Sequence, residues 1–157
     1  RGLNRLAEFA GLLEQMRRLK LVDRILLFVG QNGGGLPVPG KPYTVKAQQG
    51  WSTRDGVDVL KAYNFDLLVD HHYAAMLLQM VEQGKVINTV GEMPEGAILK
   101  AFYRDEGVVQ SVLYFLHCDG AQLVYLSLAS YTAPFTPDQL VRMEMLVHRL
   151  RGVLQSP

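Results

Sequence analysis

The chain of 157 residues contains a single cysteine, Cys118, and a single tryptophan, Trp51. One cysteine excludes an internal disulfide and fits a reducing compartment, so we expect a cytoplasmic protein. No apolar run approaches the roughly 18 residues of a membrane-spanning helix, and the charged N-terminus does not read as a signal peptide. The net charge of +1 gives no electrostatic reason to expect nucleic-acid binding by this chain.

The apolar content is that of an ordinary globular protein, with 48% hydrophobic residues. A chain of this length forms one domain with a core of its own, so we expect a single domain over residues 1–157. Because the chain begins at Arg1 instead of methionine, we also expect it to be part of a longer protein.

The strongest local pattern lies between Val108 and Ser130, where two apolar runs flank Asp119-Gly120. Such a pair predicts a β-hairpin with a two-residue type I′ turn. This register would place Tyr114 opposite Tyr125 on one face of the sheet. Since both faces of the hairpin are largely apolar, we expect the sheet to be covered on both sides. Helices would cover one side, and a loop, a ligand or a second chain the other.

Amphipathic helices are predicted at both ends, over Leu3–Lys20 and Thr136–Gln155. Thr136 is a good N-cap, and Gln139 three residues later completes a capping box. Each helix has a wider apolar arc than one sheet face requires, which predicts a homodimer through these helices. The residues that we assign to the dimer interface are Leu6, Leu13, Met145, Leu146 and Val153.

The segment Gly30–Pro42 is rich in glycine and proline and is predicted to be a loop between two strands. Gly35 to Lys41 has the G-x-x-x-x-G-K spacing of a phosphate-binding loop. Pro42 stands where Ser or Thr should hold Mg²⁺, and a strand follows where a helix is needed. The pattern therefore favours a plain connection over nucleotide binding.

Asp70-His71-His72 follows a short apolar run and resembles one motif of the DHH phosphoesterases, in which these residues ligate metal. The further aspartates of that family are missing here, since Asp23 stands alone near the N-terminus. We favour Asp70 as the N-cap of a helix over His71–Gln83 that ends at Gly84. A metal-dependent hydrolase that uses Asp70, His71 and His72 is the less favoured alternative.

Catalytic pairs are not evident elsewhere. His117 and Cys118 are neighbours on a predicted strand, so their side chains point to opposite faces and cannot form a dyad. No close pair of ligands has the spacing of a zinc site. We expect neither an enzyme nor a bound metal or cofactor.

The order of the predicted elements indicates an α+β fold, with an antiparallel sheet flanked by helices. The segments Ala101–Arg104, Leu126–Leu128 and Pro134–Thr136 resemble the end of the GAF-like N-terminal domains of LuxR-type transcription regulators. The resemblance covers Ala101–Leu154. It implies a GAF- or PAS-like sensor domain whose last helix passes a signal to a DNA-binding domain.

A sensor needs a concave apolar site with a few polar anchors. The residues that we assign to a site for a small apolar or aromatic ligand are Trp51, Tyr63, Phe65, Met76, Tyr103, Tyr114 and Tyr125. The ligand would stabilise one arrangement of the sheet face and shift the packing of the terminal helices across the dimer. The alternative is a ligand-free module that dimerises or docks a partner through a flat apolar patch.

Overall fold

The computed structural model describes residues 2–31 and 34–155. A six-stranded antiparallel sheet has the order β3-β2-β1-β6-β5-β4. Its strands are β1 (Arg24–Gln31), β2 (Thr44–Ser52), β3 (Leu67–Leu68), β4 (Lys85–Thr89), β5 (Gln110–Cys118) and β6 (Leu123–Ser130). The helices are α1 (Gly2–Arg18), α2 (His71–Gln83), α3 (Ile98–Glu106) and α4 (Pro137–Gln155), with 3₁₀ turns η1 (Val59–Ala62) and η2 (Val90–Glu92). The predicted α+β class is confirmed.

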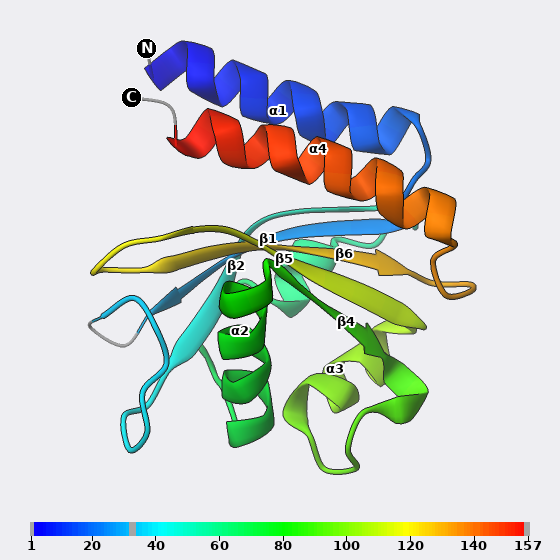
Figure 1. Cartoon of the computed structure of the whole chain (residues 1–157). Helices are drawn as coiled ribbons and strands as arrows, with labels where there is room; N and C mark the ends of the chain where they lie inside the picture. Colours follow the sequence, from blue (N-terminus) through cyan, green and yellow to red (C-terminus); the bar gives the residue numbers. More distant parts are fainter. Residues whose placement is uncertain (1, 32–33, 156–157) are drawn as a thin grey trace.

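Helices cover both faces of the sheet (Figure 1). Helices α1 and α4 lie side by side on one face, which we call the outer face, and α2 and α3 lie on the other, the inner face. Each face has its own buried cluster, with Met16 and Leu126 in the outer one and Leu26 and Tyr125 in the inner one. The prediction that both faces are covered is confirmed, but helices α2 and α3 cover the second face, where a loop, a ligand or a second chain was expected. Among the described helices, none is long and apolar enough to cross a bilayer.

The predicted helix ends are present in atomic detail. The Thr136 hydroxyl accepts a hydrogen bond from the Gln139 amide at 3.1 Å, and the Gln139 side chain accepts one from the Thr136 amide at 2.8 Å. This is the reciprocal pairing of a capping box. Gly84 ends α2 with φ of 88°, a left-handed conformation that glycine adopts at little cost.

The connection between β1 and β2 is the plain link that the sequence predicted. Strand β2 begins at Thr44 and no helix follows Lys41, so Gly35–Lys41 does not have the context of a phosphate-binding loop. The Tyr43 hydroxyl donates a hydrogen bond to the Gly35 carbonyl at 2.8 Å, which ties the loop back to the start of β2.

The hairpin is present, but its predicted register is wrong. The loop has four residues, Asp119–Gln122, because the Asp119 carboxylate accepts hydrogen bonds from the Ala121 and Gln122 amides. A bulge between Phe115 and His117 adds one more residue to β5. Lengthening the loop by two residues leaves each side chain on its predicted face of the sheet. The single extra residue in the bulge, by contrast, moves the β5 side chains beyond it to the opposite face. Tyr125 is therefore opposite Phe115.

The consequence is that the two tyrosines do not share a surface. Tyr114 lies in the outer cluster with Leu126, whereas Tyr125 lies in the inner cluster. A single ligand site containing both Tyr114 and Tyr125, as the predicted register required, is not formed.

Candidate functional site

A buried polar network lies on the inner face, beside the neighbouring strands β1 and β6. The Arg24 guanidinium is fully buried and meets the Glu106 carboxylate at two points, with Nε–Oε2 at 3.0 Å and Nη2–Oε1 at 3.2 Å. Its Nη1 donates to the Ser127 hydroxyl at 2.7 Å. The hydroxyls of Tyr63 and Tyr131 donate to the same carboxylate at 2.6 and 2.7 Å. The network joins the start of β1, the end of α3 and the end of β6.

The titration of Glu106 reflects two opposed effects. Burial by itself raises the pKa of this carboxyl, but the Arg24 charge and the hydrogen bonds from Arg24, Tyr63 and Tyr131 outweigh it and hold the pKa below its usual value. Burial raises the pKa of Tyr63. The tyrosine therefore stays protonated and serves as a donor to an ionised carboxylate.

The hydroxyls of other inner-face tyrosines also have hydrogen-bond partners. The hydroxyls of Tyr73 and Tyr125 are 2.7 Å apart, and the Tyr103 hydroxyl lies 2.8 Å from the Ser111 hydroxyl. The Tyr125 ring stacks on Phe28 at 5.1 Å between centroids. These side chains are packed in the inner cluster, and a hollow of this face lies nearer to an edge of the sheet.

A hollow of about 320 Å³ lies at such an edge, between α2, the edge strand β4 and the segment that leads into α3. We call it the α2–β4 hollow. Its lining is mostly apolar, with one carboxylate, one imidazole and two amide groups at intervals: Asp70, His72, Tyr73, Ala75, Met76, Gln79, Val86, Ile87, Asn88, Met93, Pro94, Ala97 and Leu99. A few polar groups within apolar walls are typical of small-molecule sites.

Asp70 organises this hollow because it caps two helices at once. One carboxylate oxygen accepts the Tyr73 amide of α2 at 2.9 Å, and the other accepts the Ile98 amide of α3 at 2.9 Å. The capping role predicted for Asp70 is confirmed, and the second cap could not be read from the sequence. Both oxygens are thus engaged in backbone hydrogen bonds.

The two histidines beside Asp70 are exposed, with ring centroids 4.0 Å apart. Within the described ranges, no group of three or more His, Cys, Asp or Glu side chains is placed to hold a metal ion. The geometry around Asp70 is that of a helix cap, and the hydrolase alternative gains no support from it.

A buried lysine fixes the wall of the α2–β4 hollow that the segment before α3 forms. Lys100 of α3 is 3% exposed, and its Nζ donates to the Met93 carbonyl at 2.6 Å and to Glu95 Oε1 at 2.7 Å. Hydrogen bonds from Arg104 and Lys100 lower the pKa of Glu95 to about 2. The segment from Met93 to Ala97 is therefore held onto α3 as a fixed wall.

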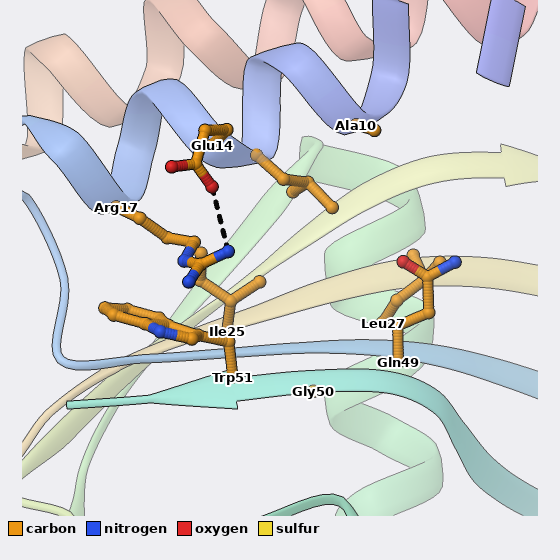
Figure 2. Close-up of a pocket in the computed structure, with 9 residues that line it drawn as sticks. Ala10, Glu14, Arg17, Ile25, Leu27, Gln49, Gly50 and Trp51 are labelled. Carbon is orange, nitrogen blue, oxygen red and sulfur yellow. Dashed lines mark hydrogen bonds and ion pairs between the residues drawn. The ribbon is translucent and has the colours of Figure 1, made fainter. Parts of the chain in front are cut away.

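A second, smaller hollow lies on the outer face between α1 and strands β1 and β2 (Figure 2). Its volume is about 210 Å³, below the roughly 300 Å³ at which small-molecule sites begin. The Arg17 guanidinium lies over the Trp51 ring at 5.1 Å and pairs with Glu14 at 2.8 Å. Trp51 is half-buried here, so the only tryptophan of the chain is placed where it contacts α1.

The residues predicted to bind a ligand are distributed over three places. Met76 lines the α2–β4 hollow and Trp51 lines the outer one. Tyr63, Tyr103 and Tyr125 are core side chains of the inner face, and Tyr114 belongs to the outer cluster. Phe65 is 42% exposed, and its ring centroid lies 6.0 Å from that of Phe102.

The sequence analysis missed most of the lining of the α2–β4 hollow. Asn88, Met93, Pro94 and Leu99 come from three segments without a shared motif or spacing. Only the tertiary fold brings them together.

The residues assigned to a dimer interface are also divided. Leu146 and Val153 are buried within the chain, and Val153 also lines a groove between α1 and α4. Leu13 is half-buried and lines the outer hollow. Met145 is 64% exposed. Leu6 lies outside the residues whose side chains the structure describes.

Solved structures with the same architecture are GAF domains. The chain is similar to the GAF domain of a two-component sensor histidine kinase from Bacillus halodurans, with 12% identity, TM-score 0.60 and coverage of 93% of this chain and 92% of that one. It is also similar to the phycoerythrobilin-bound GAF domain of a cyanobacterial phytochrome, with 14% identity, TM-score 0.61 and coverage of 96% and 90%.

A third similar structure is the GAF domain/HD domain protein from Geobacter sulfurreducens, with 11% identity, TM-score 0.62 and coverage of 92% and 88%. No protein-family model matches the sequence, and no curated protein is similar to it in sequence. The likeness is thus one of fold, and the chain has the fold of a GAF domain. The GAF-like architecture predicted from the sequence is confirmed.

Proposed function

We propose that this chain is a sensory domain that binds a small, mostly apolar molecule in the α2–β4 hollow and reports its presence through α4. The observation that carries the proposal is the hollow itself, whose volume of about 320 Å³ lies within the range of small-molecule sites. A GAF neighbour of known structure holds phycoerythrobilin, which supports the capacity of this fold to retain a small molecule.

A path from the hollow to α4 runs along α2. Residues of α2 between His72 and Gln79 line the hollow, and the helix ends at Gly84. The Gly84 carbonyl accepts a hydrogen bond from Arg151 Nη2 of α4 at 2.6 Å. A ligand that displaces α2 acts directly on this contact, and it shifts α4 only if it binds one arrangement more tightly than the other.

The proposal is tested by blocking the hollow. Gln79 and Leu78 are neighbours on α2 and both are exposed, but only Gln79 lines the hollow. In Gln79→Phe the ring should occupy the hollow, and Leu78→Phe is the matched control. Native mass spectrometry of the purified protein, followed by a small-molecule screen for increases in Tm, identifies bound compounds. Their effect on Tm should vanish in Gln79→Phe and persist in Leu78→Phe.

The same titration reports on the outer face. Because Trp51 is the only tryptophan and contacts Arg17 of α1, its fluorescence should change when a compound binds the hollow and α1 or α4 moves. Compounds that bind equally well to Gln79→Phe would place the site elsewhere. A protein that retains no compound and responds to none would favour the ligand-free alternative below.

We further propose that the output is transcription regulation of the LuxR type and that the domain itself catalyses no reaction. The support is the resemblance of Ala101–Leu154 to the sensor domains of those regulators, in which the last helix leads to the DNA-binding domain. The test is DNA binding by the full-length protein with and without the ligand. The cytoplasmic location indicated by the single cysteine remains a prediction.

A second candidate function is dimerisation, favoured by the open groove between α1 and α4. The groove has a volume of about 500 Å³, and a Cβ placed on Gly11 or Gly152 would meet nothing within 4 Å. Glycines at such positions let another helix approach closely. Met145 and Val141 lie exposed on the same side of α4.

Light scattering measures this interface directly. A homodimer through the groove should dissociate in Gly152→Glu or Met145→Glu. The exposed Leu68, on the edge strand β3 and outside the groove, provides the control Leu68→Glu. A mass that is unchanged in all three variants would exclude this face as the interface.

A further inference from the structure

A third hollow, of about 240 Å³, lies where α4 crosses the junction of α2 with β4 and the strand β5. We call it the α4 seam. Its lining is strongly polar and carries both signs of charge: Gln83, Gly84, Lys85, Tyr114, Glu144, Val147, His148 and Arg151. It is separate from the α2–β4 hollow, with which it shares no lining residue.

Tyr114 is the unusual member of this set. Its side chain is 1% exposed, and its hydroxyl is the one buried side-chain polar atom without a hydrogen-bond partner among the described residues. A buried hydroxyl without a partner costs free energy that a core Phe would not. Burial raises the pKa of Tyr114, so the group is a neutral hydroxyl with a proton to donate.

The guanidinium of Arg151 lines the same hollow, and only part of its hydrogen-bonding capacity is taken up. Its Nε donates to the Phe115 carbonyl and its Nη2 to the Gly84 carbonyl, which fixes the group against β5 and the end of α2. Its Nη1 has no hydrogen-bond partner within the described residues. A positioned guanidinium with a free N–H pair is suited to a carboxylate or phosphate oxygen.

The remaining charges leave the seam positive. Lys85 pairs with Glu144 on the rim, so these two largely cancel. Arg151 forms no salt bridge among the described residues, although the Glu144 charge acts on it. The seam thus combines two hydrogen-bond donors without acceptors, the Tyr114 hydroxyl and Arg151 Nη1, with an excess of one positive charge.

We propose that the α4 seam binds a small oxyanion, either phosphate or a carboxylate group, which accepts hydrogen bonds from the Tyr114 hydroxyl and Arg151 Nη1, with Lys85 offsetting the repulsion from Glu144. The anion would fasten α4 to β5 and to the end of α2, and so would oppose movement of α4. This site goes beyond the proposed sensory function and does not depend on the ligand in the α2–β4 hollow.

The test compares Tm in sodium phosphate, sodium acetate and sodium chloride at matched ionic strength and pH. At an anion concentration tenfold above its dissociation constant, Tm should rise by about 3–5 °C above the value in chloride. The rise should be lost in Tyr114→Phe and reduced in Lys85→Gln. Arg149→Gln is the control, because Arg149 is exposed on α4 but lines the groove with α1 instead of the seam.

In chloride, Tyr114→Phe should leave Tm unchanged or raise it, because the hydroxyl has no partner to lose. A response to phosphate alone would identify a phosphate site, and a response to acetate alone a carboxylate site. No rise above chloride, or an equal rise in Tyr114→Phe, would overturn the proposal. A Tm that Tyr114→Phe lowers equally in all three salts would show a buried water in place of the anion. Gln79→Phe should keep the phosphate response, so failure of either proposal is recognised separately.

Discussion

Arg24 and Glu106 lie 82 residues apart in the sequence and form a two-point ion pair on the inner face, where the start of β1 meets the end of α3. The pair holds the end of α3 against β1, and Tyr63 and Tyr131 complete the hydrogen bonding of the carboxylate. Neither charge reaches bulk water, since the Arg24 side chain is 0% and the Glu106 side chain 8% exposed. Each charge therefore depends on the other.

Removal of one partner of this buried pair should lower the free energy of unfolding far more than removal of one partner of an exposed pair. Glu106→Gln leaves a buried guanidinium without a counter-charge, and we expect a loss of about 3–5 kcal/mol in the free energy of unfolding. The control is Arg142→Gln, which breaks the exposed pair with Asp138 and should cost at most about 1 kcal/mol through that contact. Urea unfolding followed by circular dichroism measures both. Equal losses in the two variants would show that the buried pair contributes nothing special.

The same carboxylate predicts a pH dependence of stability. Its pKa in the folded protein lies below the usual value of 4.5, so between these two pKa values the unfolded chain binds more protons than the folded one. The stabilisation by Glu106 is therefore fully present above about pH 4.5 and is lost as the pH falls through the folded value. The difference in unfolding free energy between the wild type and Glu106→Gln should be constant at neutral pH and shrink below pH 4.5. A difference that is independent of pH would contradict the assignment.

Asp70 caps both α2 and α3, so its replacement should cost more than that of an ordinary cap. An N-cap carboxylate contributes typically about 1 kcal/mol, and Asp70→Ala removes two such interactions at once. We expect a loss of about 2 kcal/mol in chemical unfolding. Asp58→Ala provides the matched control, since Asp58 caps only the single turn η1.

Hydrogen exchange separates the two caps. Asp70→Ala should accelerate exchange of the Tyr73 and Ile98 amides together. Faster exchange at Tyr73 alone would show that the link to α3 is not maintained in solution.

The hydroxyls of Tyr73 and Tyr125 are fully buried and lie 2.7 Å apart. Replacement of either tyrosine by phenylalanine leaves the other hydroxyl without its partner, which should cost about 1–3 kcal/mol. The double variant removes both polar groups and should cost less than the sum of the two single ones. A double-mutant cycle measured by urea unfolding gives the coupling energy, and strict additivity would mean that the hydroxyls do not interact.

Local patterns in the sequence predicted the parts of the fold that depend on neighbours along the chain. Thr136 and Gln139 form their capping box, and Asp70 and Gly84 delimit α2, because a cap is made by residues within one turn of the helix. The hairpin was predicted for the same reason. Its register was not, because Asp119 closes a loop of four residues and a bulge between Phe115 and His117 adds a residue to β5.

The candidate site was predicted far less well. Met76 was assigned to a ligand site and lines the α2–β4 hollow, but the tyrosines assigned with it are core residues or lie on the other face. A tyrosine in an apolar pattern has the same appearance in a sequence whether its hydroxyl contacts a ligand, a carboxylate or another tyrosine. The choice between these is made by residues distant in sequence, as the Tyr63–Glu106 and Tyr73–Tyr125 contacts show.

The sequence by itself determined the class of the fold, the ends of α2 and α4 and the covering of both sheet faces, since hydrophobic period and helix capping act over a few residues. Only the tertiary structure decided which face of the sheet each tyrosine occupies and where the hollows lie. It also decided the pairing of Arg24 with Glu106 and the capping of two helices by Asp70. These are contacts between segments tens of residues apart, and their energies depend on burial and on partners that no short stretch of sequence contains.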